Sequence, residues 1–396
     1  MPFFRTTIVA ALLLFCSAAF ADGTLPSRPA QVERTAGIDR LLEGAISRGL
    51  IAGGVVLIGD RQGMLFERPY GRMSTEPDAG PMETDTVFDL ASLTKVVATT
   101  PAILKLAEEG RLSLVDPLVK WFPEFAGKGK EDLLVANLLT HTSGLDDFPL
   151  AADAPLQSAI NGAAAQKIKG ELWSRFRYAD INFILLAELV RRASGAGLDR
   201  YTAASFYAPL GMEDTGFNPD REKVARCSAT LGEGKSFFLG VPQDGECRLL
   251  GGVAGHAGLF STARDLARFC RMLLGEGSIG GTRILSERAV RQMTAPYFSR
   301  GGRVVRGLGW DIDSPYSSPK GNGFSEVSFG HTGYSGSSIW IDPASDTFVV
   351  LLTARLEYRK TREFSQLRGD LSSLAAELFG VSRDGGRVAR TDGNRR

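Results

Sequence analysis

The sequence has few of the residues that usually build metal or redox centres. Its 396 residues include three histidines and four cysteines. His141, His256 and His331 lack metal-ligand spacing, and neither a C-x-x-C nor an H-E-x-x-H pattern occurs, so we predict no metal site and no cofactor. A G-x-S-x-G pattern is also absent, which argues against an α/β-hydrolase.

The chain has no excess of charge of one sign. It contains 46 Lys and Arg residues against 45 Asp and Glu residues, a formal net charge of +1. This balance creates no strong field that would attract nucleic acid or a membrane surface. The length allows a large core, and a hydrophobic content of 43% is typical of a soluble globular protein.

Hydrophobic runs long enough to span a bilayer are also missing. The most apolar segment, residues 8–15, follows Arg5 and precedes the small-x-small site Ala19-Phe20-Ala21. It is too short for a membrane anchor and has the three parts of a signal peptide. We therefore expect a signal peptide at 1–21, no stable membrane anchor, and a periplasmic or secreted mature protein.

The cysteines beyond this segment fall in two settings. Cys227 and Cys247 lie in a Gly-rich, loop-like region, and in an oxidising compartment they could form a disulfide. Cys270 lies on the apolar face of a predicted helix, where a buried free thiol is expected.

Strand patterns occur near both ends of the chain. Val55–Ile58 and Met64–Phe66 predict a hairpin, and Val327–Gly330, Ser338–Ile341 and Phe348–Leu352 predict three more strands. The region between these two groups is mainly helical in pattern.

This order predicts an α/β fold of the α+β type. We expect an antiparallel sheet formed by both termini and flanked by helices, with an inserted all-helical lobe. The predicted hydrolase domain covers 22–381, with a sheet lobe at about 35–90 and 300–380 and a helical lobe at about 91–299. Residues 382–396 are rich in Arg, Gly and Asp and are expected to be disordered.

Ser92-Leu93-Thr94-Lys95 is the most informative stretch. It lies where the extended segment 87–90 gives way to a helical pattern at 96–109, so the two polar side chains share one helix face. If the site desolvates the lysine amine, its pKa falls and it can take the serine proton. The structural alternative is an ordinary N-cap serine. A second S-x-x-K pattern, Ser317–Lys320, lies among prolines and a glycine, where no helix is expected.

Two further patterns follow in order along the chain. Tyr178-Ala179-Asp180 opens an amphipathic run, and His331-Thr332-Gly333 lies on a predicted strand. With Ser92 and Lys95 these patterns resemble the serine β-lactamase and penicillin-binding-protein superfamily, whose signature is S-x-x-K, a Tyr or Ser motif, and K-T-G. The sequence is most similar to the class C β-lactamase-related branch, which also holds esterases and peptidases that recognise D-amino acids. The resemblance covers about 35–380 and includes the segments 109–117, 138–145 and 252–260.

The resemblance implies a role for each motif residue. Ser92 would be the nucleophile that becomes acylated, Lys95 the base in acylation, and Tyr178 a proton relay to the leaving group. Because an unperturbed tyrosine pKa is about 10, Tyr178 needs a cationic neighbour such as Lys95. The backbone N–H groups of Ser92 and Tyr334 would form the oxyanion hole.

Two motif positions depart from the family pattern. Asp180 stands where many relatives carry Asn, and because an ionised Asp only accepts hydrogen bonds, it would bind a substrate amine or hold Lys95. His331 stands where many carry Lys, and since a histidine is mostly neutral at pH 7, we expect weaker anchoring of a β-lactam carboxylate. Asp180, His331, Thr332 and Gly333 are the predicted substrate-binding residues. His256 also begins a His-x-Gly pattern, but between Gly-rich turns, so we interpret His141 and His256 as loop-structuring residues.

These motifs predict an exported serine hydrolase that works through an acyl-enzyme on an ester or amide. The expected substrate is a small molecule or a peptidoglycan-derived peptide, and the favoured activities are those of an esterase or a D-Ala-type peptidase. A muropeptide amidase and a β-lactamase are alternatives of the same class. A non-catalytic penicillin-binding or wall-sensing domain is an alternative of another class, although such a domain has no need of Ser92, Lys95 and Tyr178 together.

Overall fold

The computed structural model describes residues 28–168, 170–232, 236–300 and 304–380. The predicted signal peptide and the predicted C-terminal tail lie outside these residues. By its internal contacts the chain divides into residues 1–36 and residues 37–396. The described part of the first unit is helical, and the second unit contains the elements and the site discussed below.

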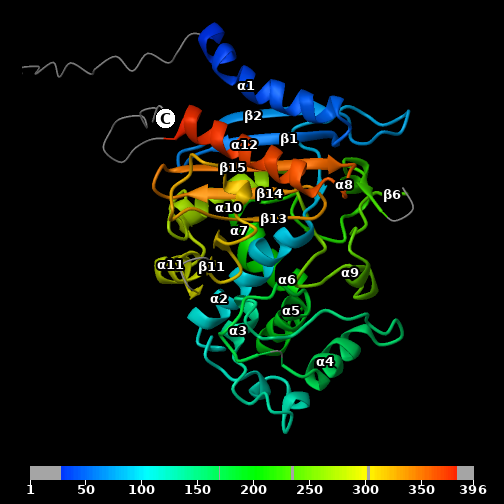
Figure 1. Ribbon diagram of the computed structural model, residues 1–396, viewed down its shortest axis with the longest axis vertical. Helices are drawn as coiled ribbons and strands as arrows, with labels where there is room; N and C mark the ends of the chain where they lie inside the picture. The colour runs from blue at the N-terminus through cyan, green and yellow to red at the C-terminus, as the bar shows by residue number, and fades with distance from the viewer. Residues whose placement is uncertain (1–27, 169, 233–235, 301–303, 381–396) are drawn as a thin grey trace, which may run out of the picture. The chain divides into compact units, whose positions relative to one another are not determined.

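An antiparallel sheet is the main element of the second unit (Figure 1). Its strands follow the spatial order β10-β11-β12-β13-β14-β15-β1-β2, so the two ends of the chain meet where β15 pairs with β1. The strand bounds are β1 Ile51–Gly59, β2 Met64–Gly71, β10 Phe298–Arg300, β11 Val304–Arg306, β12 Asp311–Asp313, β13 Phe329–Thr332, β14 Ser338–Asp342 and β15 Thr347–Arg355.

Side chains alternate between the two faces of the central strands, as the pleat of a strand requires. On β1, Val55 and Leu57 pack into one core cluster, while Val56 and Ile58 pack into another. Helix α10 (Ala263–Leu274) covers the first face, and α12 (Thr361–Phe379) covers the second. Because both faces are covered, β1 and β15 are buried along their whole length.

The segment between β2 and β10 is mainly helical. Its helices are α2 Thr100–Glu108, α3 Val135–Leu139, α4 Pro155–Ala165, α5 Ile181–Ser194, α6 Leu198–Thr202, α7 Ala208–Leu210, α8 Arg221–Ala225, α9 Gly245–Leu249, α10 and α11 Glu287–Thr294. It also holds the short strands β3 Phe88–Asp89, β4 Gly216–Phe217, β5 Thr230–Leu231, β6 Phe237–Phe238, β7 Leu259–Ser261, β8 Ser278–Ile279 and β9 Thr282–Arg283.

The predicted fold class is confirmed: a large antiparallel sheet is built from both ends of the chain and flanked by helices. The expectation of an all-helical insertion needs correction, because β4 and β7 lie within it and form a small sheet with β3. These strands are only two or three residues long, too short to give an alternating sequence pattern. No helix among the described residues is long and apolar enough to cross a membrane.

The predicted disulfide between Cys227 and Cys247 is absent, and this prediction is wrong. Both cysteines are free and buried, as is Cys270. Cys227 packs with Val87 and Phe260, whereas Cys247 packs in a separate cluster with alanines. Each thiol therefore fills its own part of the core as a small apolar group.

Candidate active site

A tight turn presents Ser92 at the end of β3. Asp89 ends the strand, and its side chain accepts a hydrogen bond from the backbone N–H of Ala91 at 2.9 Å. Ala91 has φ 45°, a conformation that is uncommon for residues other than glycine. Ser92 follows within the short 3₁₀ turn Ala91–Leu93, where it lines a cavity. The local chain therefore exposes one hydroxyl group on an otherwise buried turn.

Lys95 lies one turn after Ser92, and its side chain is completely buried. Its ammonium group lies 3.0 Å from the hydroxyl oxygen of Ser92 and donates to the carbonyl of His256 at 3.1 Å. The helical segment that carries Lys95 begins directly after the turn, as the Ser-x-x-Lys spacing predicts.

Asp180 forms an ion pair with Lys95. Its Oδ1 lies 2.6 Å from the lysine Nζ. Burial lowers the pKa of Lys95, but the charge of Asp180 and the hydroxyl of Tyr178 together raise it above its ordinary value. Burial raises the pKa of Asp180, and Lys95 more than offsets this, so the carboxyl pKa is below its usual range. The expectation that the lysine pKa falls is therefore wrong for the free enzyme, because Asp180 stabilises the ammonium form.

Tyr178 completes the group around Ser92. Its ring centroid lies 4.9 Å from the Lys95 Nζ, and Tyr178 lines the same cavity as Ser92. Burial raises the pKa of Tyr178, and Lys95 lowers it only in part. The ring stacks on His141 at 4.5 Å between centroids, and His141 accepts a hydrogen bond from the N–H of Ala179 at 3.2 Å. His141 thus holds both the ring and the backbone of the second motif, a role more specific than that of a loop-structuring residue.

The third motif lies beside the turn that carries Ser92. β13 ends at Thr332, and a Cβ atom at Gly333 would lie 2.3 Å from the carbonyl of Leu90, so only glycine allows this approach. Ser335 and Ser337 donate hydrogen bonds to the carbonyls of Asp89 and Leu90 at 2.6 and 2.8 Å. These two serines were not singled out from the sequence, although they fix the turn that carries Ser92.

The predicted oxyanion hole has suitable donors. Ser92 and Tyr334 line the same cavity, which has a volume of about 340 Å³. Within the described chain, neither of their backbone N–H groups donates to another backbone or side-chain acceptor. Both donors are therefore available to a developing oxyanion.

His331 lies at the wall of this cavity but carries no charge. Burial, together with the nearby charges of Arg306 and Lys95, holds the pKa of His331 well below its usual range. Its Nδ1 lies 2.9 Å from the carbonyl of Thr332. The ring therefore contributes shape and hydrogen bonding, and no positive charge for a substrate carboxylate.

Two arginines supply the positive charge that His331 lacks. Arg355 and Arg368 line the cavity, and in the described part of the chain neither forms an ion pair with a carboxylate. Arg355 donates to the carbonyl of Tyr334 at 3.1 Å, and Arg368 donates to the carbonyl of Gly333 at 2.7 Å. Burial, with the like charge of Arg355, lowers the pKa of Arg368 to about 9. The expectation of weak carboxylate anchoring considered only His331 and missed this pair.

A sequence model of the Beta-lactamase family matches residues 38–368. The chain belongs to the Beta-lactamase family. It is 30% identical over 365 residues to a protein of Escherichia coli (strain K12) named "Putative D-alanyl-D-alanine carboxypeptidase", a match that covers 81% of this chain and 82% of that protein. A protein of the same name from Salmonella agona (strain SL483) is 28% identical, with 69% and 70% covered.

Solved structures share the fold of this family member. The chain is similar to EstCE1, described as a hydrolase with promiscuous acyltransferase activity, with a TM-score of 0.71, 22% identity, and 87% and 100% of the two chains covered. It is also similar to a class C β-lactamase, with a TM-score of 0.72, 19% identity, and 88% and 98% covered. A penicillin-binding-protein homologue from Caulobacter crescentus gives a TM-score of 0.71 at 21% identity, with 86% and 98% covered. The family match and the carboxypeptidase-like relatives together identify the protein as a serine hydrolase.

The second S-x-x-K pattern is not part of the site of this Beta-lactamase family member. Ser317 is buried, and its hydroxyl donates to Asp311 at 2.8 Å. A single 3₁₀ turn, Ser318–Lys320, does form there, although no helix was expected. Lys320 points to the carbonyl of Ile312, so this serine and lysine do not act together.

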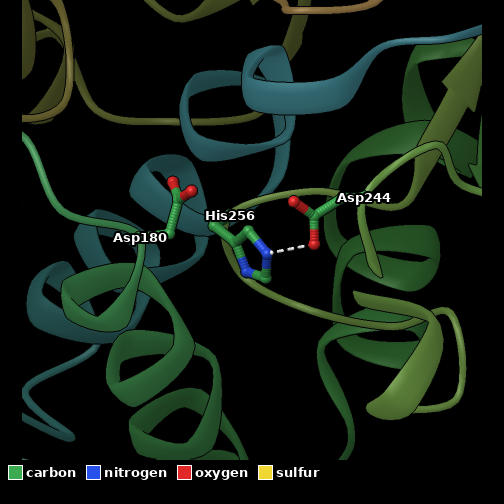
Figure 2. A group of neighbouring side chains, drawn as sticks. All are labelled: Asp180, Asp244 and His256. Carbon is green, nitrogen blue, oxygen red and sulfur yellow. Dashed lines mark hydrogen bonds and ion pairs between the residues drawn. The ribbon is translucent and has the colours of Figure 1, made fainter. Parts of the chain in front are cut away.

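Asp180, the ion-pair partner of Lys95, also belongs to a group of two carboxylates and an imidazole. Asp180, Asp244 and His256 place possible ligand atoms within 4.8 Å of one another (Figure 2). His256 Nε2 lies 2.8 Å from Asp244 Oδ1. A metal ion at this place would compete with Lys95 for Asp180. His256 therefore has two roles, since it holds Asp244 through its ring and Lys95 through its carbonyl.

Proposed function

We propose that this protein is an exported D-Ala-type peptidase with esterase activity, which removes a carboxylate-bearing leaving group from a wall-peptide-like substrate through an acyl-enzyme on Ser92. The observation that carries the proposal is the position of Arg355 and Arg368. These guanidinium groups have no carboxylate partner in the described chain and line the cavity into which Ser92 opens. A leaving group that ends in a carboxylate would pair with them.

The names of the relatives support the same proposed activity. The Escherichia coli relative carries the name of a D-alanyl-D-alanine carboxypeptidase, and a terminal D-alanine bears such a carboxylate. The signal-peptide pattern in residues 1–21 supports export to a periplasm or beyond, where wall peptides occur.

Acylation begins from a charged lysine and a charged carboxylate. As Ser92 Oγ bonds to the substrate carbonyl carbon, Lys95 passes a proton to Asp180 and takes the serine proton in its place. The new oxyanion accepts hydrogen bonds from the N–H groups of Ser92 and Tyr334. Tyr178 then gives its proton to the leaving nitrogen or oxygen and recovers one from Lys95.

A β-lactamase is the second candidate, because the same arginines would hold the carboxylate of a β-lactam. The two activities differ in the step after acylation. A peptidase that is only acylated by a β-lactam accumulates a stable adduct, whereas a β-lactamase hydrolyses it.

Purified protein should therefore be compared on three substrates: an N-acylated D-Ala-D-Ala peptide, a p-nitrophenyl ester and a chromogenic cephalosporin. We expect release of D-alanine and nitrophenol, with little cephalosporin turnover. Ser92→Ala should abolish both activities while the fold is retained. Ser317→Ala, at the second S-x-x-K pattern, is the matched control and should keep activity.

Intact-mass analysis with a fluorophosphonate should then locate the adduct on Ser92. An adduct on Ser317, or on any serine other than Ser92, would reject Ser92 as the nucleophile. Efficient cephalosporin turnover without release of D-alanine would assign the protein to the β-lactamases.

A further inference from the structure

A second cavity, of about 310 Å³, lies beside the catalytic group. Asp180 lines this cavity, and the same carboxylate lies 2.6 Å from the Lys95 ammonium. We call this cavity the acidic pocket, because four carboxylates line it. They belong to Asp147, Asp180, Asp244 and Glu246.

Positive charge in the acidic pocket does not balance these carboxylates. Among the described residues, Lys95 is the only lysine or arginine that forms an ion pair with any of the four. Asp147 accepts a hydrogen bond from the N–H of Ile181 at 2.8 Å, and Glu246 accepts one from Leu150 at 3.3 Å. Burial, together with the charge of Asp180, raises the pKa of Asp147 above its usual range. The pocket therefore favours a cation.

His256 adds a second, independent sign of a missing ligand. His256 Nε2 lies 2.8 Å from Asp244 Oδ1, and although burial raises the pKa of Asp244, this hydrogen bond lowers it, so the carboxylate only accepts hydrogen bonds. Nε2 therefore carries the proton of this hydrogen bond, and in that tautomer Nδ1 is an acceptor. His256 is 1% exposed and lines the pocket, and its Nδ1 has no hydrogen-bond partner among the described residues. Figure 2 shows the ring between the two carboxylates.

The remaining wall of the pocket favours an organic cation over a metal ion. It is apolar and is formed by Phe148, Pro149, Leu150, Ile181 and Ile184. An aliphatic chain that ends in an ammonium group suits both the apolar and the acidic parts of the pocket. The chain would contact the apolar residues, and the ammonium group would donate hydrogen bonds to the carboxylates and to Nδ1 of His256.

We propose that the acidic pocket binds a primary ammonium group on an aliphatic part of the acyl half of the substrate. This inference rests on the proposed function, in which Ser92 takes the acyl group. The leaving half bears a carboxylate and lies at Arg355 and Arg368, which would repel an ammonium group. The preferred substrate is thus positively charged on its acyl side and negatively charged on its leaving side.

Two p-nitrophenyl esters of equal length test this preference. The 6-aminohexanoate ester ends in an ammonium group, and the heptanoate ester ends in a methyl group at the same position. For the wild-type protein we expect kcat/KM to be roughly 10-fold or more higher for the amine ester, as one hydrogen-bonded charge contact allows.

Variants of the pocket should lower this ratio. Asp147→Asn and Glu246→Gln each keep an oxygen that can accept the backbone N–H bonded there, so the local fold is retained. Each should lower the ratio several-fold, and the double variant should bring it close to one. Glu131→Gln removes an exposed carboxylate outside the pocket and should leave the ratio unchanged.

Each contrary outcome has a distinct meaning. If the wild-type protein hydrolyses the heptanoate ester at least as well as the amine ester, the acidic pocket does not bind the acyl amine, and the proposed function still stands. If activity on the heptanoate ester rises with added Zn²⁺ and falls with a chelator, the pocket holds a metal ion and our inference is overturned. If neither ester is hydrolysed and the fluorophosphonate leaves Ser92 unlabelled, the proposed function fails, and this inference fails with it.

Discussion

The ammonium group of Lys95 lies 2.6 Å from a carboxylate oxygen of Asp180. Burial alone would lower the lysine pKa, but this contact and the hydroxyl of Tyr178 raise it instead. The free enzyme thus holds a charged lysine next to Ser92, the proposed nucleophile. A proton must move to Asp180 before Lys95 can accept another from Ser92, so the pH dependence of acylation should follow the ionisation of Asp180.

The variant Asp180→Asn tests this proton route. In the wild-type protein the ascending limb of the pH profile of kcat/KM should lie at acidic pH, because Lys95 lowers the pKa of Asp180. In the variant the base must be neutral Lys95, so the limb should move to higher pH. On a p-nitrophenyl ester we expect kcat/KM at pH 6 to fall by roughly 10-fold or more and to recover as the pH rises.

Glu131→Gln, an exposed change outside the site, serves as the control and should keep the wild-type profile. An unchanged limb in the Asp180→Asn variant would show that Asp180 takes no part in moving the proton.

Arg355 should decide the preference for substrates with a carboxylate. The variant Arg355→Gln removes a guanidinium group from the cavity of Ser92, while Arg355→Lys keeps the positive charge. We expect Arg355→Gln to lower kcat/KM for an N-acylated D-Ala-D-Ala peptide by roughly 10-fold to 100-fold more than for a neutral ester. The lysine variant should recover part of this loss.

The two substrates separate charge recognition from packing. Arg355 also lies over the rings of Tyr358 and Phe364, so its removal affects both substrates to some extent. An equal loss on both substrates, without recovery by lysine, would show that Arg355 acts only through packing.

Much of the fold is visible in the sequence because the central strands carry strong local signals. Val55 to Ile58 and Phe348 to Leu352 are apolar and include β-branched valine and isoleucine, and both segments fall within strands buried on two faces. The Ser92-x-x-Lys95 spacing indicates the pairing of these side chains for a similar reason, since one helical turn brings them together. Features that depend on local chain geometry were therefore predictable.

The remaining features depend on contacts between distant segments. Arg368 reaches Gly333 across 35 residues, and His256 lies beside Lys95 although 161 residues separate them. No local sequence pattern indicates such contacts. The direction of the Lys95 pKa shift also depends on a distant segment, because Asp180 raises this pKa by more than burial lowers it.

Protein produced as residues 22–396 should have three free thiols, even when it is prepared without reductant. Cys227, Cys247 and Cys270 are buried and free. Burial raises the pKa of each thiol, that of Cys227 to about 12, so little thiolate is present at neutral pH. A thiol reagent should react slowly with the native protein and should titrate three groups after unfolding in denaturant. A count of one would instead show that Cys227 and Cys247 are paired.

Asp89 should make the stability of the fold depend on pH between about 4 and 6. This carboxyl group is buried beside the turn that carries Ser92, and burial raises its pKa to about 6. The folded state therefore binds a proton more tightly than the unfolded state, whose Asp pKa is about 3.9. Stability from this group is present below the unfolded pKa and is lost as the pH rises to 6, a change of about 3 kcal/mol.

Other ionisable groups change the free energy of unfolding with pH in the opposite direction. The contribution of Asp89 must therefore be measured as the difference between the wild type and an Asp89 variant. Burial lowers the pKa of His141 and of His331, and their contribution is lost as the pH falls below the unfolded histidine value. In Asp89→Asn the side-chain oxygen can still accept the hydrogen bond from the N–H of Ala91. The NH₂ group of the variant replaces the carboxylate oxygen that accepts a hydrogen bond from the N–H of Gln243 at 2.8 Å in the wild type. Losing that bond costs about 1 kcal/mol at every pH.

The measurement is urea unfolding of wild type and Asp89→Asn at pH 4, 5, 6 and 7. Relative to the wild type, the variant should become more stable by about 2 kcal/mol between pH 4 and pH 7, because it has no carboxylate to ionise. Asp132→Asn, on the exposed surface, should leave the wild-type curve unchanged. If the difference between wild type and Asp89→Asn is the same at all four pH values, the buried carboxyl group does not titrate in this range. Its part in the active site would then be confined to the hydrogen bonds that hold Ala91 and Gln243.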